Sequence, residues 1–264
     1  MKKKIDGVIF DWAGTTVDYG CFAPLEVFMK IFKEAGIEIT YEEARKPMGL
    51  LKIDHTRALL EMERIKELWN KKYGRDYTEE DLNKLYSRFE EVLFQNLENF
   101  ATPIPGVLKL VENLRKKGIK IGSTTGYTKE MLDIVAENAE ELGYQPDFRV
   151  TATEVPSGRP YPYMIYKNMI ELQLADRKSV IKVGDTISDI KEGKGAGVWA
   201  VGILKGGSEL GFSREEVEKM EPTLLRYYMD KTARRFFDAG ADYVVDEIGD
   251  LEKIIDIIEN QSGV

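Results

Sequence analysis

The chain has 264 residues, with 38 Lys and Arg against 46 Asp and Glu, which gives a formal net charge of −8 at pH 7. Hydrophobic residues make up 43% and charged residues 32%, a composition typical of a folded globular protein and not of a disordered chain. The acidic balance argues against a nucleic-acid-binding surface, because such a surface normally carries a basic patch.

One cysteine, Cys21, and one histidine, His55, narrow the possible chemistry. A single cysteine cannot form an intramolecular disulfide, which agrees with a reducing compartment. The same counts exclude zinc sites that need two His or several Cys ligands. A metal ion should therefore be hard and bound by carboxylates, and Mg²⁺ is the leading candidate.

The sequence carries no recognisable export or membrane signal. The basic start is followed by a short apolar run, Val8–Phe10, before Asp11. This run is too short for the core of a signal peptide, and no other apolar run reaches the roughly 18 residues of a membrane span. We therefore expect a cytoplasmic protein without a membrane partner.

Short apolar segments alternate with helical patterns along most of the chain. The expected strands lie at 5–10, 118–123, 179–183, 198–203 and 241–245. The expected helices lie at 107–117, 129–142, 163–172 and 188–196. This alternation predicts an α/β fold, with a Rossmann-like parallel sheet and right-handed crossovers.

Residues 20–99 interrupt the alternation. Helical periodicity dominates there, Thr40 with Glu43 fits a capping box, and Thr78 caps a long acidic helix. We therefore predict a helical cap domain at 20–99, inserted after the first strand of a core made of 1–19 and 100–264. The segment 208–240 is helical and highly charged, and its pattern indicates no function.

Polar residues stand at the carboxyl ends of three expected strands. Asp11, Thr125 and Asp185 occupy these ends, and Asp189 follows four residues after Asp185. Ligands of open parallel sheets bind at this edge. The carboxylates would repel one another unless a cation lay among them, so the pattern predicts a metal site.

The same edge has the features of a phosphate site. The hydroxyl of Thr125 and the backbone amides that follow from Gly126 would suit a phosphoryl group. Arg159 lies in a loop before a helix, in the run Ser157–Pro162, and its guanidinium could clamp a phosphoryl group with two hydrogen bonds.

A lysine in the cap has unusual neighbours. Met48, Lys52 and His55 are spaced to share one face of a helix. A lysine desolvated on such a face has a lowered pKa and can attack a carbonyl as a free amine. A solvated helical lysine is the ordinary alternative.

Three segments, in this order along the chain, resemble the motifs of the haloacid dehalogenase superfamily. They are Phe10-Asp-Trp-Ala-Gly-Thr-Thr16, Ser123-Thr-Thr-Gly126 and Val183-Gly-Asp-Thr-Ile-Ser-Asp189. The resemblance covers nearly the whole chain, with the cap in the place that the superfamily expects. It implies that Asp11 is the nucleophile of an Mg²⁺-dependent phosphoryl transfer.

One position departs from the superfamily pattern. Its phosphatases usually carry an aspartate two residues after the nucleophile, as the acid that protonates a leaving alcohol, and this chain has Ala13. Loss of such an acid typically costs about 10²–10⁴-fold in rate. The substitution is consistent with a leaving group that is not an oxygen, or with a protein that is not a catalyst.

Lys52 and the run Gly158–Pro162 resemble the branch of this superfamily that cleaves a carbon–phosphorus bond. The resemblance implies hydrolysis of phosphonoacetaldehyde to acetaldehyde and phosphate, through an imine on Lys52 and a phosphoryl group on Asp11. It also implies that Asp11, the Ala13 carbonyl and Asp185 hold Mg²⁺, and that the protein is a homodimer.

Several assignments stay open at this stage. Asp189 binds the metal directly, binds it through water, or caps a helix. His55 either packs inside the cap or transfers a proton, and Met48, Cys21 and Tyr127 are candidates to line the substrate site. The rival functions are a sugar-phosphate phosphatase or mutase of the same superfamily and a catalytically silent phosphoanion-binding module.

Overall fold

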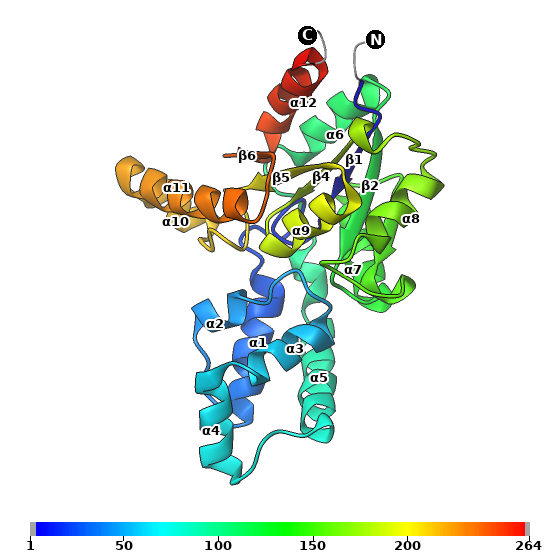
Figure 1. Cartoon of the computed structure of the whole chain (residues 1–264). Helices are drawn as coiled ribbons and strands as arrows, with labels where there is room; N and C mark the ends of the chain where they lie inside the picture. The colour runs from blue at the N-terminus through cyan, green and yellow to red at the C-terminus, as the bar shows by residue number, and fades with distance from the viewer. Residues whose placement is uncertain (1–3, 262–264) are drawn as a thin grey trace.

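The computed structural model describes residues 4–261, which form a parallel sheet covered by helices and a group of helices set apart from it (Figure 1). In this part of the chain the sheet has six strands in the order β3-β2-β1-β4-β5-β6. The strands are β1 (Gly7–Phe10), β2 (Lys120–Thr125), β3 (Phe148–Thr151), β4 (Val180–Gly184), β5 (Trp199–Ile203) and β6 (Tyr243–Val245).

Helices cover both faces of the sheet, because successive side chains of a strand point to opposite sides. Val8 and Phe10 of β1 pack toward one layer, whereas Ile9 between them packs toward the other. The first layer contains α6 (Val107–Lys116), α7 (Lys129–Glu141) and α12 (Leu251–Asn260). The second contains α8 (Tyr163–Glu171), α9 (Ile187–Ala196) and α11 (Pro222–Asp238).

The remaining short helices connect these elements. They are α10 (Arg214–Lys219), η1 (Leu97–Phe100), η2 (Ala152–Glu154), η3 (Arg177–Ser179) and η4 (Ile248–Asp250). Helices α10 and α11 extend sideways from the sheet (Figure 1). They confirm the helical character predicted for 208–240.

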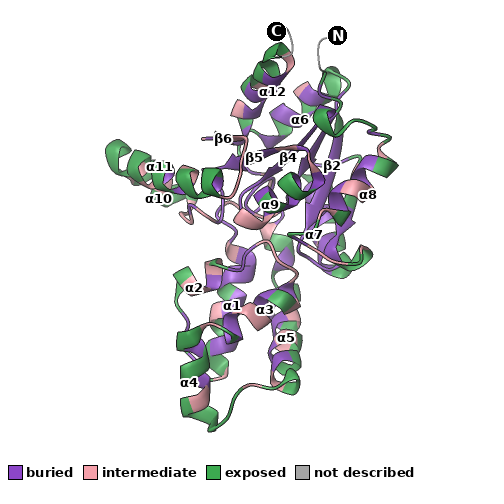
Figure 2. Ribbon diagram, viewed as in Figure 1, coloured by how far each residue is buried: buried purple, intermediate pink, exposed green. Residues whose placement is uncertain are grey.

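The cap helices lie at the carboxyl edge of the sheet (Figure 1). They are α1 (Phe22–Glu34), α2 (Tyr41–Arg45), α3 (Lys52–Leu60), α4 (Glu63–Tyr73) and α5 (Glu79–Phe94). Capping boxes begin α2 at Thr40 and α5 at Thr78, as expected for these residues. Buried hydrophobic residues of α1, α3 and α5 belong to the same hydrophobic cluster, and Figure 2 shows the buried parts of these helices facing one another. The exact domain boundary at 20–99 stays a prediction, and residues 1–3 and 262–264 of the predicted core lie outside the described residues.

The predicted elements agree closely with the structure, with one omission. All five expected strands are present, and the four expected core helices match within one residue at each end. Strand β3 was not predicted, because it is four residues long and its exposed Arg149 interrupts the apolar pattern. Among the described helices, none combines the length and hydropathy of a membrane span.

Candidate active site

The predicted carboxylates meet at the carboxyl edge of the sheet. Phe10 at the end of β1 pairs with Ser123 of β2 and with Val183 of β4, so these strands end side by side. Asp11 and Asp185 follow directly, and Asp189 lies in the first turn of α9. Oxygen atoms of these three buried residues, here called the acidic cluster, lie within 4.8 Å of one another.

Asp185 is held by the loop that follows β1 and by the loop that follows β5. Its Oδ1 accepts a hydrogen bond from the Thr15 hydroxyl at 2.8 Å, and its Oδ2 accepts one from the Ser208 amide at 2.7 Å. A Cβ on Gly14, whose φ is +85°, would lie 2.3 Å from Oδ2, so this close approach requires glycine. Burial, with the nearby charges of Asp11 and Asp189, raises the pKa of Asp185 well above its ordinary value.

Asp189 has two kinds of partner. Its Oδ2 accepts hydrogen bonds from the Thr186 hydroxyl at 2.6 Å and amide at 3.2 Å, which closes the capping box of α9. Its Oδ1 forms ion pairs with Arg159 Nη2 at 3.1 Å and Lys182 Nζ at 2.8 Å, but within residues 4–261 it has no hydrogen bond of good geometry. Although burial acts the other way, these two cations lower the pKa of Asp189.

The donor set fits a divalent hard cation. When all are ionised, the buried carboxylates of the acidic cluster and of Glu192 carry four negative charges, and the buried cations Arg159 and Lys182 that pair with them supply two positive ones. A shortfall of two positive charges in a buried site is costly unless a cation binds there. The buried oxygen Oδ1 of Asp189 and the carboxylate chemistry both agree with Mg²⁺. The position of the Ala13 carbonyl as a ligand stays a prediction.

Arg159 is anchored to the acidic cluster from a loop before α8. Its Nη2 lies 2.7 Å from Asp11 Oδ1, and its Nε lies 2.9 Å from Glu192 Oε2. Its side chain is fully buried. The structure shows Arg159 in contact with a carboxylate, and its predicted contact with a phosphoryl group stays a prediction.

The loop after β2 lies beneath the cap. The amide of Tyr127 donates to Thr125 Oγ1 at 3.1 Å, which leaves the hydroxyl proton of Thr125 free for another acceptor. A Cβ on Gly126 would lie 2.4 Å from the carbonyl oxygen of Leu50, and one on Gly49 would lie 2.5 Å from Thr186 Oγ1. The cap loop at 47–51 therefore packs directly on the core edge, and the structure shows a closed cap.

Lys52 enters the site from the cap. It is the first residue of α3, 4% exposed, and its Nζ lies 5.3 Å from the centroid of the Tyr127 ring. Burial lowers the pKa of Lys52 below that of an ordinary lysine, and the positive end of the α3 dipole acts in the same direction. Lys52 is thus the desolvated lysine that the sequence predicted, and not a solvated one.

The predicted helical face of Met48, Lys52 and His55 was wrong in one respect. Met48 lies in the turn before α3, which begins at Lys52, because Gly49 at φ +86° ends any helical continuation. All three side chains are nevertheless buried.

His55 is packed inside the cap. Its Nε2 lies 2.9 Å from the carbonyl oxygen of Ala44, and its ring stacks on Phe28 with centroids 3.9 Å apart. Burial lowers the pKa of His55 well below its ordinary value, so the ring is neutral with its proton on Nε2. Its Nδ1 has no partner in the described part of the chain, which leaves the proton-transfer role a prediction.

The linker before α1 places Cys21 and a residue that sequence reasoning missed. Burial raises the pKa of the Cys21 thiol well above its ordinary value, so it stays protonated. Asp18 is also buried, and its carboxylate accepts hydrogen bonds from the amides of Phe22 at 3.2 Å and Ala23 at 3.1 Å. Burial raises the pKa of Asp18 to about 7. Asp18 lies among ordinary loop residues, and no sequence pattern there indicates a buried or functional carboxyl.

Lys182 and Glu192 were also missed. Lys182 lies within β4 and Glu192 on α9, and both are fully buried beside Arg159. A signal did exist for Lys182, because a charged residue inside a strand covered on both faces must find an opposite charge.

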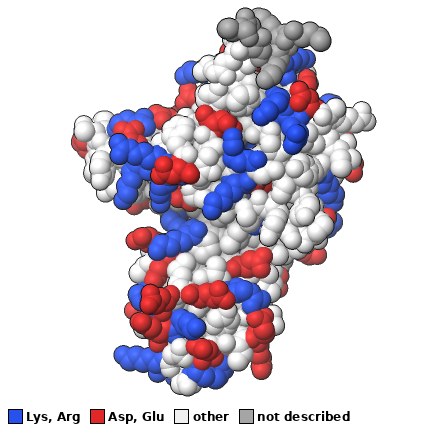
Figure 3. Space-filling model, in the orientation of Figure 1, with Lys and Arg blue, Asp and Glu red and all other residues white. Residues whose placement is uncertain are grey.

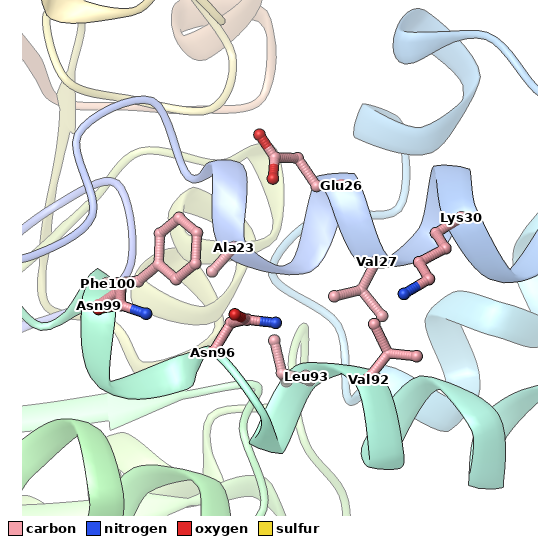
Figure 4. A pocket seen from close by; sticks show the side chains of 9 residues that line it. All are labelled: Ala23, Glu26, Val27, Lys30, Val92, Leu93, Asn96, Asn99 and Phe100. Atoms are coloured by element: carbon pink, nitrogen blue, oxygen red, sulfur yellow. The ribbon is translucent and has the colours of Figure 1, made fainter.

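Five surface cavities among residues 4–261 are lined by residues outside the acidic cluster. A cavity of about 390 Å³ lies between α1 and the end of α5 (Figure 4), and the residues that line it include Ala23, Val27 and Leu93 but none of the acidic cluster. Acidic and basic side chains are interspersed over the face in Figure 3.

The comparisons with known proteins agree with this architecture. A family model described as haloacid dehalogenase-like hydrolase matches residues 5–197. The chain therefore belongs to the haloacid dehalogenase-like hydrolases.

Its relatives define the branch within that family. A phosphonoacetaldehyde hydrolase of Bacillus mycoides is 58% identical over 98% of both chains. A bifunctional phosphonoacetaldehyde hydrolase/aminoethylphosphonate transaminase of Clostridioides difficile is 56% identical, and the match covers 99% of this chain and 42% of that protein. A solved structure of a phosphonoacetaldehyde hydrolase-like protein from Oleispira antarctica superposes with a TM-score of 0.95 at 38% identity, covering 98% of this chain and 94% of that one. The chain is thus an enzyme of the phosphonoacetaldehyde hydrolase family.

Proposed function

We propose that the chain hydrolyses the carbon–phosphorus bond of phosphonoacetaldehyde to acetaldehyde and phosphate. The relatives that carry this activity in their names support the substrate. The observation that carries the mechanism is the pairing of a desolvated Lys52 in the cap with Ala13 in the position of the missing acid.

Lys52 is the electron sink of the proposed reaction. Its Nζ attacks the aldehyde carbon, and loss of water gives a protonated imine. The carboxylate of Asp11 then attacks phosphorus, and the electron pair of the broken carbon–phosphorus bond moves into the imine to form an enamine. Because the leaving atom is carbon, no acid is needed at position 13.

Two hydrolyses complete the cycle. The enamine takes a proton at carbon, and water releases acetaldehyde and the free amine of Lys52. A second water cleaves the phosphoryl group from Asp11 to give phosphate. Thr125 and Arg159 would hold the phosphonyl oxygens through both stages, since each has a donor group at this edge.

Mg²⁺ would be held by Asp11, Asp185 and the Ala13 carbonyl, with Asp189 as a direct or water-mediated ligand. When bound, it supplies positive charge that neutralises the phosphonyl oxygens. Removal of metal with a chelator should abolish turnover, and added Mg²⁺ should restore it.

The closed cap gives the reaction a dry site. Packing of the 47–51 loop on Gly126 keeps bulk water away from the imine and lowers the local dielectric. Both effects favour the neutral amine of Lys52 before attack.

The proposal is tested by assaying acetaldehyde and phosphate from phosphonoacetaldehyde, alongside a sugar phosphate ester. We expect equal amounts of both products from the phosphonate and little release from the ester. Lys52→Arg keeps the charge but cannot form the imine at neutral pH, so turnover should be lost. Asp11→Ala should also lose turnover while still forming the imine. Full activity of either variant, or good activity on the ester, would contradict the mechanism.

The assembly and location are part of the same proposal. We propose a homodimer formed through the cap, in the cytoplasm, and no nucleic-acid partner. Sedimentation of the purified chain at several concentrations measures the assembly, and a monomer at all of them would contradict it.

A further inference from the structure

A second buried charge pair lies behind the acidic cluster, formed by Lys182 and Glu192. Lys182 is in β4, where it pairs in register with Ile9 of β1 and Ala200 of β5, at the centre of the sheet. Glu192 lies on α9, and Gly193 beside it lets the helix approach closely, since a Cβ there would lie 3.1 Å from Lys182 Cβ. Both side chains are fully buried.

The ammonium of Lys182 has three oxygen neighbours, one by hydrogen bond and two by ion pairing. Its Nζ lies 2.8 Å from Thr124 Oγ1, 2.8 Å from Asp189 Oδ1 and 3.5 Å from Glu192 Oε2. It therefore ties the end of β2 to the start of α9, and it offsets two negative charges that would otherwise be buried unpaired.

Glu192 holds the guanidinium of Arg159 at its Nε atom. Its Oε2 lies 2.9 Å from Arg159 Nε and accepts from the Thr124 hydroxyl at 3.3 Å. A second nitrogen, Arg159 Nη2, donates to Asp11 Oδ1 at 2.7 Å and to Thr124 Oγ1 at 2.7 Å. Because the group is planar, fixing Nε and Nη2 also fixes the third nitrogen, Nη1.

Nη1 is the nitrogen of Arg159 with protons to spare. Its contact with the carbonyl oxygen of Gly49 in the cap loop is long, at 3.5 Å. It therefore lies between the core edge that carries Asp11 and the cap loop, where the phosphonyl group must bind if the proposed function is correct.

We propose that Glu192, balanced by Lys182, is a positioning residue that orients Arg159 toward the phosphonyl group. Glu192 shares the guanidinium with Asp11, so Arg159 neither swings away from the loop nor pairs with the nucleophile alone. Lys182 contacts the carboxylates of both Glu192 and Asp189 and holds them in place. This inference rests on the proposed function for its substrate, but the anion-binding role of Arg159 can be measured without turnover.

The experiment compares wild type with Glu192→Gln, Arg159→Lys and the double variant Arg159→Lys/Glu192→Gln. Two measurements are made in the presence of MgCl₂: phosphate binding, as its dissociation constant, and steady-state kinetics with phosphonoacetaldehyde, as kcat/KM from kcat and KM. Glu154→Gln is the matched control, because it removes one carboxylate that pairs with Lys167 at 3.2 Å on the surface near the same loop.

We expect Glu192→Gln to lower kcat/KM by about 100-fold, the typical effect of a group displaced by about 1 Å in an active site. It should weaken phosphate binding by about tenfold or more, as substitutions of supporting residues commonly do. In the Arg159→Lys background the same change should add little, because lysine has no Nε for Glu192 to hold. Glu154→Gln should leave both quantities near wild type.

A further double variant covers the case in which Glu192→Gln does not fold. Lys182→Met/Glu192→Gln removes both charges, and such paired removal from a buried site often preserves stability. We expect a wild-type-like melting temperature with kcat/KM still reduced by about 100-fold.

Two results would overturn the inference. One is recovery of both melting temperature and kcat/KM in the Lys182→Met/Glu192→Gln variant, since this indicates a purely structural charge pair. The other is a Glu192→Gln effect that multiplies fully with Arg159→Lys, since the two residues would then act independently. A third result separates the two proposals. If the dissociation constant of phosphate changes across the variants as expected, but the wild type does not cleave phosphonoacetaldehyde, the proposed function is contradicted and this inference is supported.

Discussion

The amine of Lys52 in the cap lies over the ring of Tyr127 in the core, with Nζ 5.3 Å from the ring centroid. This contact brings a residue of α3 to the loop after β2, two residues beyond Thr125. An ammonium over an aromatic face gains about 0.5–2 kcal/mol, which offsets part of the cost of burying it. The cap thus supplies a reactive amine to an edge that otherwise carries the carboxylates and phosphate-binding groups of the sheet.

The buried Lys52 should weaken the fold at neutral pH. Burial lowers the pKa of Lys52 below the unfolded value of 10.5. At a pH between this lowered pKa and 10.5, the folded chain therefore binds fewer protons than the unfolded chain. Its contribution to stability therefore rises as pH increases toward 10.5. We predict that Lys52→Met melts at a higher temperature than wild type at pH 7 and that the difference shrinks toward pH 10. Calorimetry at both pH values measures this, and a less stable variant at pH 7 would contradict it.

Gly126 should be required for cap closure. A Cβ there would lie 2.4 Å from the backbone carbonyl oxygen of Leu50, which cannot move without the 47–51 loop. We predict that Gly126→Ala lowers kcat/KM by about 100-fold through displacement of the cap. Gly249→Ala is the control, since a Cβ at Gly249 meets nothing within 4 Å. Equal activity of the two variants would show that closure does not depend on this contact.

Arg45 should stabilise the closed cap. From α2 it donates to the carbonyl oxygens of Gly20 at 3.0 Å, Ser208 at 3.2 Å and Gly211 at 3.1 Å. The amide of Ser208 in turn donates to Asp185, so these three hydrogen bonds of Arg45 also support the acidic cluster.

Loss of the three Arg45 hydrogen bonds should raise KM. We predict that Arg45→Met reduces kcat/KM by about tenfold or more, since charged hydrogen bonds typically contribute about 1.5–3 kcal/mol. Arg57→Met is the matched control, because Arg57 pairs with Glu79 on the exposed side of the cap. Steady-state kinetics of both variants test the claim, and an unchanged Arg45→Met enzyme would contradict it.

Asp18 should make the stability depend on pH below neutrality. Its pKa is raised by burial from 3.8 to about 7, so between these values the folded chain binds the additional proton. Its contribution to stability is therefore lost as pH rises through this window. The shift corresponds to about 4 kcal/mol.

The test uses Asp18→Asn, whose amide oxygen can still accept the amides of α1. We predict that wild type loses stability relative to this variant between pH 4 and pH 7. Urea unfolding at both pH values measures the difference. If the difference in free energy of unfolding between wild type and Asp18→Asn stays constant from pH 4 to pH 7, the folded chain does not hold Asp18 in its protonated form, and the prediction is contradicted.

The fold was largely predictable because its signals are local. The strands β1, β2 and β4 carry apolar runs that end at polar residues, and the capping boxes at Thr40 and Thr78 lie within four residues of sequence. The edge of the sheet then follows from parallel pairing. Strand β3 escaped prediction because four residues with an exposed arginine give no clear period.

The site was predictable where its residues end a strand, and not where they meet through space. Asp11 and Asp185 were predictable because each directly follows an expected strand. Glu192 lies within the α9 helix, and nothing in the sequence distinguishes it from a solvent-exposed glutamate before α9 packs on β4. Met48 was misplaced for a different reason, because the left-handed Gly49 ends the helical spacing before Lys52. Ion pairs between distant segments leave no periodic trace in a single sequence.

The imine on Lys52 is the central claim, and borohydride trapping tests it most directly. The chain is incubated with phosphonoacetaldehyde and sodium borohydride, digested, and analysed by peptide mass spectrometry. The account predicts a reduced adduct on the peptide that contains Lys52, with activity lost in proportion to labelling, and no adduct in Lys52→Arg. Consumption of substrate without any adduct on Lys52 would contradict it.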